Sequence, residues 1–158
     1  MPIVDKFSDA PFLPESPELM LVKNHVHQVP VMMGFTKDEG LLWSARFKTD
    51  PSFAAKFGDN WSVCGPVNIL GKESANVTGS DMTLVNSLVE IYTGTTVDKL
   101  TDLEQLRDLL TDSKFALSTH VVSQLLVGHG NKDVFKYYFN YSGKEDSYNR
   151  HLLDIYHL

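Results

Sequence analysis

A short apolar run at 29–35 constrains the fold of this chain more than any other feature of the sequence. Its residues are almost all apolar, without a polar face, which is typical of a parallel strand covered on both faces of a sheet. The polar residues 36–40 end the run abruptly, and 41–47 then resumes with helical spacing. The sequence therefore predicts a buried parallel strand, a charged turn and a helix, the order of elements found in α/β proteins.

A second strand is predicted near the end of the chain, at 134–141. Aromatic side chains occupy every second position there, and this period of two is that of a strand. They are Phe135, Tyr137, Phe139 and Tyr141. Two strands are too few to cover the predicted helices, so we expect an incomplete sheet.

Helices are predicted between the two strands. The segment 48–79 is irregular and indicates short helices joined by loops. A longer helix is predicted at 81–92, because apolar residues recur there at helical spacing. Ser80 or Asp81 is its expected N-cap, and Gly94 follows its end.

Two further helices are predicted before the second strand. One begins at Asp102, where the Thr-x-x-Glu pattern at 101–104 has the spacing of a capping box. The other is expected to be capped by Asp112 or Ser113 and to end in the glycine-rich segment 128–131. A short helical turn is also expected at 18–23, near the start of the chain.

The composition indicates a globular protein and excludes several functions. The 158 residues have the length of one domain, and 42% of them are hydrophobic. The net charge of −6 is spread along the chain, so no basic stripe is available for nucleic acid. Cys64 is the single cysteine, which excludes an internal disulfide. Neither a membrane-spanning segment nor a signal peptide is recognisable.

Three acceptor triplets for N-linked glycosylation favour a secreted glycoprotein. They begin at Asn60, Asn76 and Asn140. Such triplets also arise by chance in a chain of this length.

The turn after the first strand carries the most informative acidic residues, Asp38 and Glu39. In open α/β sheets, catalytic groups gather beyond the carboxyl ends of the strands. A carboxylate fixed there can orient a histidine and stabilise its cation. The simpler interpretation is that both residues begin the next helix, where negative charge suits the helix dipole.

A wider pattern distinguishes these interpretations. The proline-containing loop at 12–17, followed by the run and turn at 29–40, closely resembles the type-B carboxylesterase and cholinesterase family, insect-type esterases in particular. In that family the Glu of the Asp-Glu-Gly triplet is the acid of a Ser-Glu-His triad, and here this position is Glu39. The resemblance extends to the aromatic strand and glycine at 134–143. It implies a serine carboxylic-ester hydrolase that needs no metal or organic cofactor.

The chain departs from the family pattern in its other triad residues. The nucleophile should lie in a Gly-x-Ser-x-Gly elbow well before Glu39, and no such elbow is present. Ser74 follows the acid and lacks the glycine context, since Lys72 and Asn76 occupy the flanking positions, so we exclude it. The family histidine lies shortly beyond the aromatic strand, in a pattern that this chain does not contain.

Packing, capping or loop positions account for the histidines of this chain. A metal site at His25 and His27 would need a third ligand. None of the other histidines has the sequence pattern of the family's catalytic base. They are His120, His129, His151 and His157.

Residues 1–158 are therefore expected to form a single partial domain, with part of an α/β-hydrolase fold, from the C-terminal half of a carboxylesterase. The parent enzyme would hydrolyse small-molecule carboxylic esters, to which this chain contributes Glu39. Leu41, Leu42, Trp43 and Phe47 either line the acyl pocket or form the core face of their helix. Alone, the chain is expected to be inactive and poorly soluble. The alternative is a cholinesterase-like adhesion or binding protein that has lost the triad. The ester specificity and the oligomeric state are not encoded in these residues.

Overall fold

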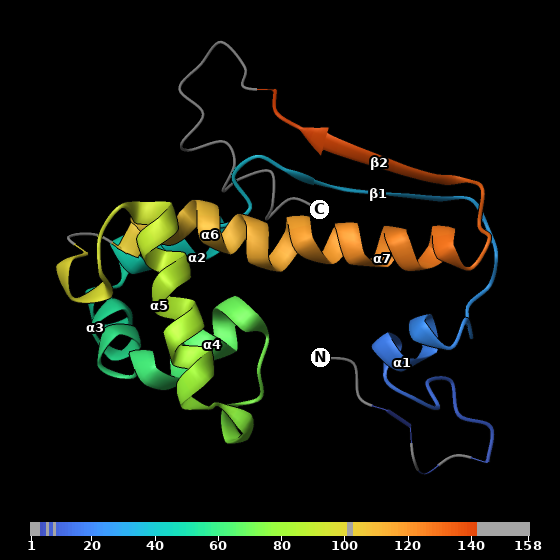
Figure 1. Ribbon diagram of the computed structural model, residues 1–158, viewed down its shortest axis with the longest axis horizontal. Helices are drawn as coiled ribbons and strands as arrows, with labels where there is room; N and C mark the ends of the chain where they lie inside the picture. The colour runs from blue at the N-terminus through green and yellow to red at the C-terminus, as the bar shows by residue number, and fades with distance from the viewer. Residues whose placement is uncertain (1–3, 6, 8, 101–102, 142–158) are drawn as a thin grey trace. The chain divides into compact units, whose positions relative to one another are not determined.

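The computed structural model describes Val4, Asp5, Phe7 and residues 9–100 and 103–141. Figure 1 shows helices for most of this length and two strands that lie side by side. The elements, in chain order, are α1 (Pro17–Val22), β1 (Val31–Thr36), α2 (Leu41–Thr49), α3 (Pro51–Asp59), α4 (Trp61–Leu70), the 3-10 helix η1 (Ser74–Asn76), α5 (Gly79–Thr93), the 3-10 helices η2 (Val97–Lys99) and η3 (Leu103–Leu106), α6 (Arg107–Thr111), the π-helix η4 (Asp112–Ala116), α7 (Leu117–Gly128) and β2 (Val134–Phe139).

The chain divides into two units, residues 1–34 with 118–137 and residues 35–117 with 138–158. In the first unit, α1 confirms the helical turn predicted at 18–23. Its N-cap is Ser16, whose hydroxyl oxygen accepts a hydrogen bond from the Leu19 amide at 3.3 Å. The Asn131 side chain donates to the Val29 carbonyl at 2.8 Å, which joins the loop after α7 to the segment before β1.

The two strands are parallel, as the sequence predicted. The Val31 amide donates to the Asp133 carbonyl, and the Lys37 amide donates to the Phe139 carbonyl, so both strands advance in the same direction. Within the described residues these strands form a two-stranded sheet. The prediction that the first strand is covered on both faces was wrong for this structure. Met32 is 74% exposed and the rest of β1 is half-buried, because the described residues do not cover the face of the strand from which the Met32 side chain projects.

The second unit contains the hydrophobic core, which lies among α2 to α6 (Figure 1). Helix α2 packs against η3 and α3, and α4 packs against α5. Aromatic rings fill the space between α2, α3 and α4: the rings of Phe47 and Phe57 lie 4.8 Å apart, and those of Phe57 and Trp61 lie 5.8 Å apart. Leu106, Leu109 and Leu110 complete this core almost without exposure.

Helix α5 confirms the helix predicted at 81–92, but its cap differs from the prediction. The N-cap is Thr78, not Ser80 or Asp81. Thr78 and Asp81 form a capping box, in which the Asp81 carboxylate accepts from the Thr78 amide at 2.9 Å. Gly94 ends the helix in the left-handed conformation, as expected.

The helix before β2 was predicted to begin at Asp112 or Ser113, and this was wrong. Thr111, Asp112 and Leu117 all have right-handed helical dihedral angles, so the chain stays helical from α6 through η4 into α7. The start predicted at Asp102 and its capping box lie outside the described residues; helical structure is described from Leu103. The predicted end is confirmed, since α7 stops at Gly128.

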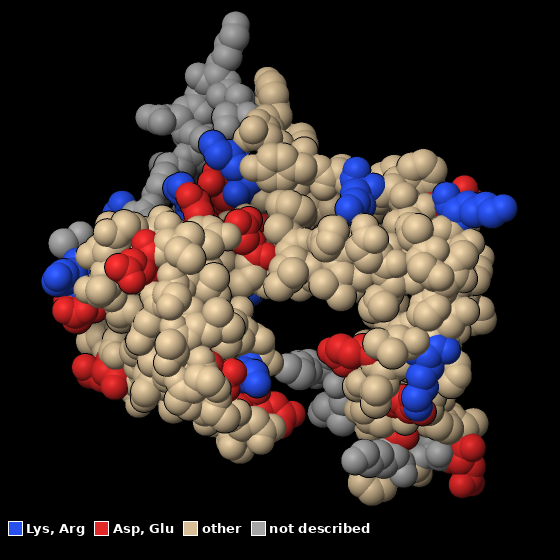
Figure 2. All heavy atoms as spheres, viewed as in Figure 1, with Lys and Arg blue, Asp and Glu red and all other residues tan. Residues whose placement is uncertain are grey.

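Charged side chains of both signs are mixed on the surface. On the face drawn in Figure 2, Lys and Arg side chains are scattered, and several lie beside Asp or Glu. Lys23 and Glu15, for example, form an ion pair at 2.8 Å. None of the described helices is long and apolar enough to cross a membrane.

Replacing Leu110 with Ala tests the core of the second unit. Leu110 is 1% exposed, so the change removes buried apolar volume and should lower the free energy of unfolding by about 2–5 kcal/mol in urea denaturation. The matched control is Leu84→Ala on α5, where the side chain is 50% exposed and a change within about 0.5 kcal/mol is expected. Equal losses from both variants would contradict this description of the core.

Candidate functional site

The turn at 37–40 joins the carboxyl end of β1 to α2, as predicted. It is short because helical hydrogen bonding begins at once: the Leu41 amide donates to the Asp38 carbonyl, and the Leu42 amide to the Glu39 carbonyl. Asp38 and Glu39 therefore occupy the last turn before the helix, where negative charge also suits the helix dipole. Both of the roles considered for these carboxylates fit this position.

Glu39 is held by the strand that precedes it. One of its carboxylate oxygens accepts a hydrogen bond from the Thr36 amide at 2.8 Å, and the side chain is half-buried. This bond turns the carboxylate back toward the end of β1 rather than out into water. Within the described residues, no histidine forms a hydrogen bond or ion pair with it.

Gly40 lies directly against α6. A Cβ atom at Gly40 would lie within van der Waals radii of the Arg107 carbonyl, so glycine is required by the closeness of the two backbones. The buried Gly40 amide donates to the Thr111 hydroxyl oxygen at 2.9 Å. The Thr111 hydroxyl in turn donates to the Arg107 carbonyl at 2.9 Å. This chain of contacts connects the turn to α6.

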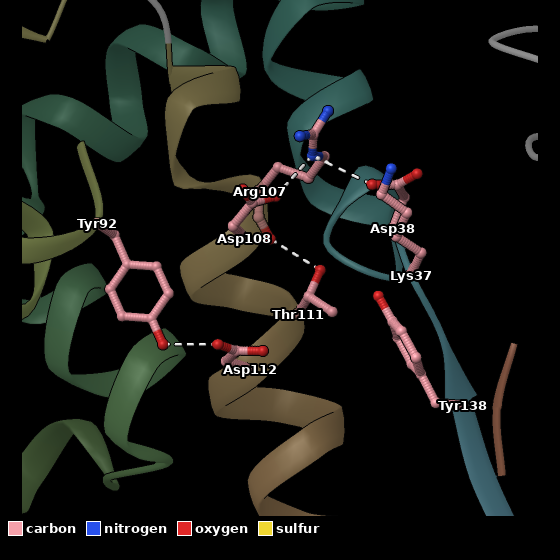
Figure 3. Close-up of a pocket in the computed structure, with 8 residues that line it drawn as sticks. All are labelled: Lys37, Asp38, Tyr92, Arg107, Asp108, Thr111, Asp112 and Tyr138. Carbon is pink, nitrogen blue, oxygen red and sulfur yellow. Dashed lines mark hydrogen bonds and ion pairs between the residues drawn. The ribbon is translucent and has the colours of Figure 1, made fainter. Parts of the chain in front are cut away.

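A cavity of about 350 Å³ lies beside this turn (Figure 3). The Arg107 side chain lies between two carboxylates, 3.5 Å from Asp38 and 2.9 Å from Asp108. On another side, the Tyr92 hydroxyl donates to Asp112 at 2.6 Å. The lining residues are Lys37, Asp38, Tyr92, Arg107, Asp108, Thr111, Asp112 and Tyr138.

Tyr92 is a hydrogen-bond donor in this cavity, and it stays protonated at neutral pH. Its hydrogen bond to Asp112 raises the pKa of Tyr92 to about 12, with smaller contributions from burial and from the charges of Asp112 and Asp108. The phenol is therefore neutral at pH 7 and keeps its bond to the carboxylate.

The apolar residues after the turn divide between two environments. Leu41 and Phe47 are buried, and Phe47 belongs to the core cluster, as the core interpretation of this helix predicts. Leu42 and Trp43 are half-buried. The Trp43 ring packs edge-on against Phe115 with centroids 6.0 Å apart, and the Lys114 amino group lies 4.7 Å from its centre.

Ser74 lies apart from any strand-to-helix elbow. It is exposed and begins the 3-10 helix η1, which follows α4 rather than a strand. A nucleophile elbow requires a strand immediately before the serine, so its exclusion agrees with the local structure.

The histidines are dispersed along the described chain. His25 and His27 are exposed in the segment between α1 and β1, and His120 is exposed on α7. The side chain of His129, after α7, is half-buried, and its Nε2 atom has no hydrogen-bond partner within the described residues. In that part of the chain, no three His, Cys, Asp or Glu side chains come together as a metal site. The remaining two, His151 and His157, lie outside it.

Thr111 and Arg107 were not predicted from the sequence as parts of the site. They belong to no recognisable motif, and Thr111 was expected to precede a new helix rather than to lie inside a continuous one. Their spacing of four residues, which lets the Thr111 hydroxyl reach the Arg107 carbonyl, is a general property of helices and not a signal for a site.

Comparison with known proteins identifies the family of this chain. The family model described as "Carboxylesterase family" matches residues 1–157. The chain belongs to the carboxylesterase family. This confirms the resemblance found in the sequence, and it implies an α/β-hydrolase fold, with which the described helices and parallel strands are compatible.

Curated relatives of this carboxylesterase-family chain come from insects. A protein named carboxylic ester hydrolase from Bombus ignitus is 24% identical over 141 residues, which cover 89% of this chain and 25% of that protein. Esterase E4 and esterase FE4 from Myzus persicae are each 27% identical over 146 residues, or 90% of this chain. The chain thus spans about a quarter of the length of these relatives. No solved structure matches it significantly.

Replacing Gly40 with Ala tests the contact between the turn and α6. The added methyl group must displace the Arg107 backbone, which should lower the free energy of unfolding by about 1–3 kcal/mol. Gly58→Ala on α3 is the matched control, because a Cβ there meets no atom within 4 Å. Urea denaturation of both variants measures the difference. An unchanged Gly40→Ala protein would contradict the close approach described here.

Proposed function

We propose that this chain supplies the acid of a serine carboxylesterase, and that Glu39 is that acid. The main support is the position of Glu39, half-buried beyond the carboxyl end of a parallel strand and turned back by the Thr36 amide. Acids of this type must be held in one orientation to fix the tautomer of a histidine. The names of the Bombus ignitus and Myzus persicae relatives, carboxylic ester hydrolase and esterase E4, agree with ester hydrolysis.

In the proposed mechanism, a serine attacks the ester carbonyl while a histidine accepts the serine proton. The histidine then gives this proton to the leaving alcohol, and water hydrolyses the acyl-enzyme by the same route. Glu39 keeps the imidazole in the required tautomer and offsets the positive charge that develops on it. Backbone amides of a glycine-rich loop would stabilise the oxyanion. The serine, the histidine and this loop are proposed to come from the parts of a carboxylesterase that these 158 residues do not include.

The substrate class is proposed to be small carboxylic esters, and the 158 residues are proposed to be inactive without the serine and the histidine. A triad without its nucleophile has no group to form the acyl-enzyme. Assay of the isolated chain with p-nitrophenyl acetate should show no turnover above buffer. Turnover that Glu39→Gln abolishes in the isolated chain would refute this proposal.

The competing proposal is a cholinesterase-like adhesion or binding protein. The two proposals differ at one position, that of the nucleophile: the enzyme has a serine there, and the binding protein has another residue. Sequencing the transcript on both sides of this segment identifies that residue. A Gly-x-Ser-x-Gly elbow upstream of Glu39 and a histidine beyond β2 support the enzyme, whereas a replaced serine supports the binding protein.

A secreted glycoprotein is proposed as the form of the mature protein. The side chains of Asn60, Asn76 and Asn140 are all exposed, so the acceptor positions are accessible to glycosylation. Expression in insect cells of the protein that carries the whole triad, followed by glycosidase treatment of the secreted protein, checks this. A mobility shift that Asn76→Gln reduces supports the proposal, and a protein retained in the cell without any shift contradicts it.

Glu39→Gln tests the proposed acid directly. Glutamine keeps an oxygen that can accept from the Thr36 amide, but it carries no charge, so the fold should persist. In the protein that carries the whole triad, we expect kcat for a nitrophenyl ester to fall about 10³–10⁴-fold, by analogy with removal of a triad carboxylate.

The matched control for this experiment is Glu90→Gln. Glu90 is exposed on α5, so the same change of charge there should leave kcat within a factor of two. Similar kcat values for Glu39→Gln and the wild type would rule out Glu39 as the triad acid.

A further inference from the structure

We propose that Thr111 is a positioning residue for Glu39, acting through the backbone of the turn. The inference rests on the proposed function, because it assigns a role in placing the triad acid. It is based on one hydroxyl group, that of Thr111 on α6. Thr111 is 71 residues from Gly40 in the sequence, and its hydroxyl forms a hydrogen bond with the Gly40 amide.

The hydrogen bonds of Thr111 have a defined direction. The Gly40 amide can only donate, so the Thr111 oxygen accepts this bond at 2.9 Å. The hydroxyl proton is then directed to the Arg107 carbonyl, also at 2.9 Å. Thr111 is 4% exposed, so water does not readily replace it as the acceptor. The Gly40 amide therefore depends on this one side chain.

The position of Gly40 decides the position of Glu39. The two residues are adjacent, and Gly40 packs so closely on Arg107 that it has no space for a Cβ atom. The Glu39 carboxylate is held separately, by the Thr36 amide at 2.8 Å. The Thr111 bond thus holds the backbone next to Glu39, and the Thr36 bond holds its side chain, so loss of the Thr111 bond releases one of these two anchors.

The nearby ion pair is a weaker anchor. Asp38 and Arg107 approach to 3.5 Å, and both side chains are partly exposed. Arg107 also pairs with Asp108 at 2.9 Å, which divides its interaction between two carboxylates. Partly exposed pairs of this kind contribute little to fixing a structure. The buried hydroxyl of Thr111 is therefore assigned the positioning role.

The test compares Thr111→Val with Thr111→Ser in the protein that carries the whole triad. Valine has the shape of threonine but no hydroxyl, whereas serine keeps the hydroxyl. We expect Thr111→Val to lower kcat for a nitrophenyl ester about 10- to 100-fold with little change in KM, as for a small misplacement of a reacting group. Thr111→Ser should stay within about threefold of the wild type. In hydrogen exchange, the Gly40 amide should lose protection in the Val variant and keep it in the Ser variant.

A double-mutant cycle separates positioning from a general structural effect. If Thr111 acts through Glu39, Thr111→Val costs no further activity once Glu39→Gln is present. Additive losses, or a Thr111→Val enzyme as active as the wild type, would overturn the proposal while a large Glu39→Gln effect still supports the function. No loss from Glu39→Gln itself would instead overturn the proposed function, and with it this role for Thr111.

Discussion

The close approach of Gly40 to the backbone of α6 is the constraint on which the site depends. It buries the Gly40 amide, and a buried amide without a partner is costly, so an acceptor is required at that place. The Thr111 hydroxyl is this acceptor. The end of β1, the turn and the first residues of α2 are consequently fixed against α6 by one steric and one polar contact. Surface charge, such as the partly exposed pair of Asp38 with Arg107, is secondary to both.

Local patterns in the sequence predicted the strands and helices well, but they predicted the residues at which the helices begin less well. The strand, turn and helix around Glu39 were predicted because the change from an apolar run to helical spacing is a local signal. At α5, Thr78, Ser80 and Asp81 are all able to cap a helix, and the sequence does not choose among them. At Asp112, burial of Leu109 and Leu110 fixes α6, and the helix continues through a residue that elsewhere begins one. Tertiary packing, rather than the local sequence, therefore determines that the helix continues past Asp112.

Only part of the candidate site could be predicted, because some of its contacts also depend on tertiary packing. Glu39 was predicted as the triad acid because it lies in a compact pattern that resembles a known family. Its supporting residue, Thr111, is joined to the turn across 71 residues, and nothing in its own neighbourhood indicates a role. Periodicity and capping rules describe interactions within about four residues. A hydrogen bond between distant segments follows from the packing of α2 on η3 and α6, which one sequence does not reveal.

The contacts that orient Glu39 do not depend on whether the faces of the sheet are covered. Parallel strands are normally covered on both faces, yet Phe135 and Tyr138, on opposite faces of β2, are both more than half exposed. Apolar surface of this kind is usually covered by further structure. The bonds to Glu39 and Gly40, however, all come from residues 36–111 of the second unit. The Glu39 carboxylate is therefore oriented within the second unit, by the Thr36 amide and by the packing of the turn on α6, and whatever covers the sheet need not supply these contacts.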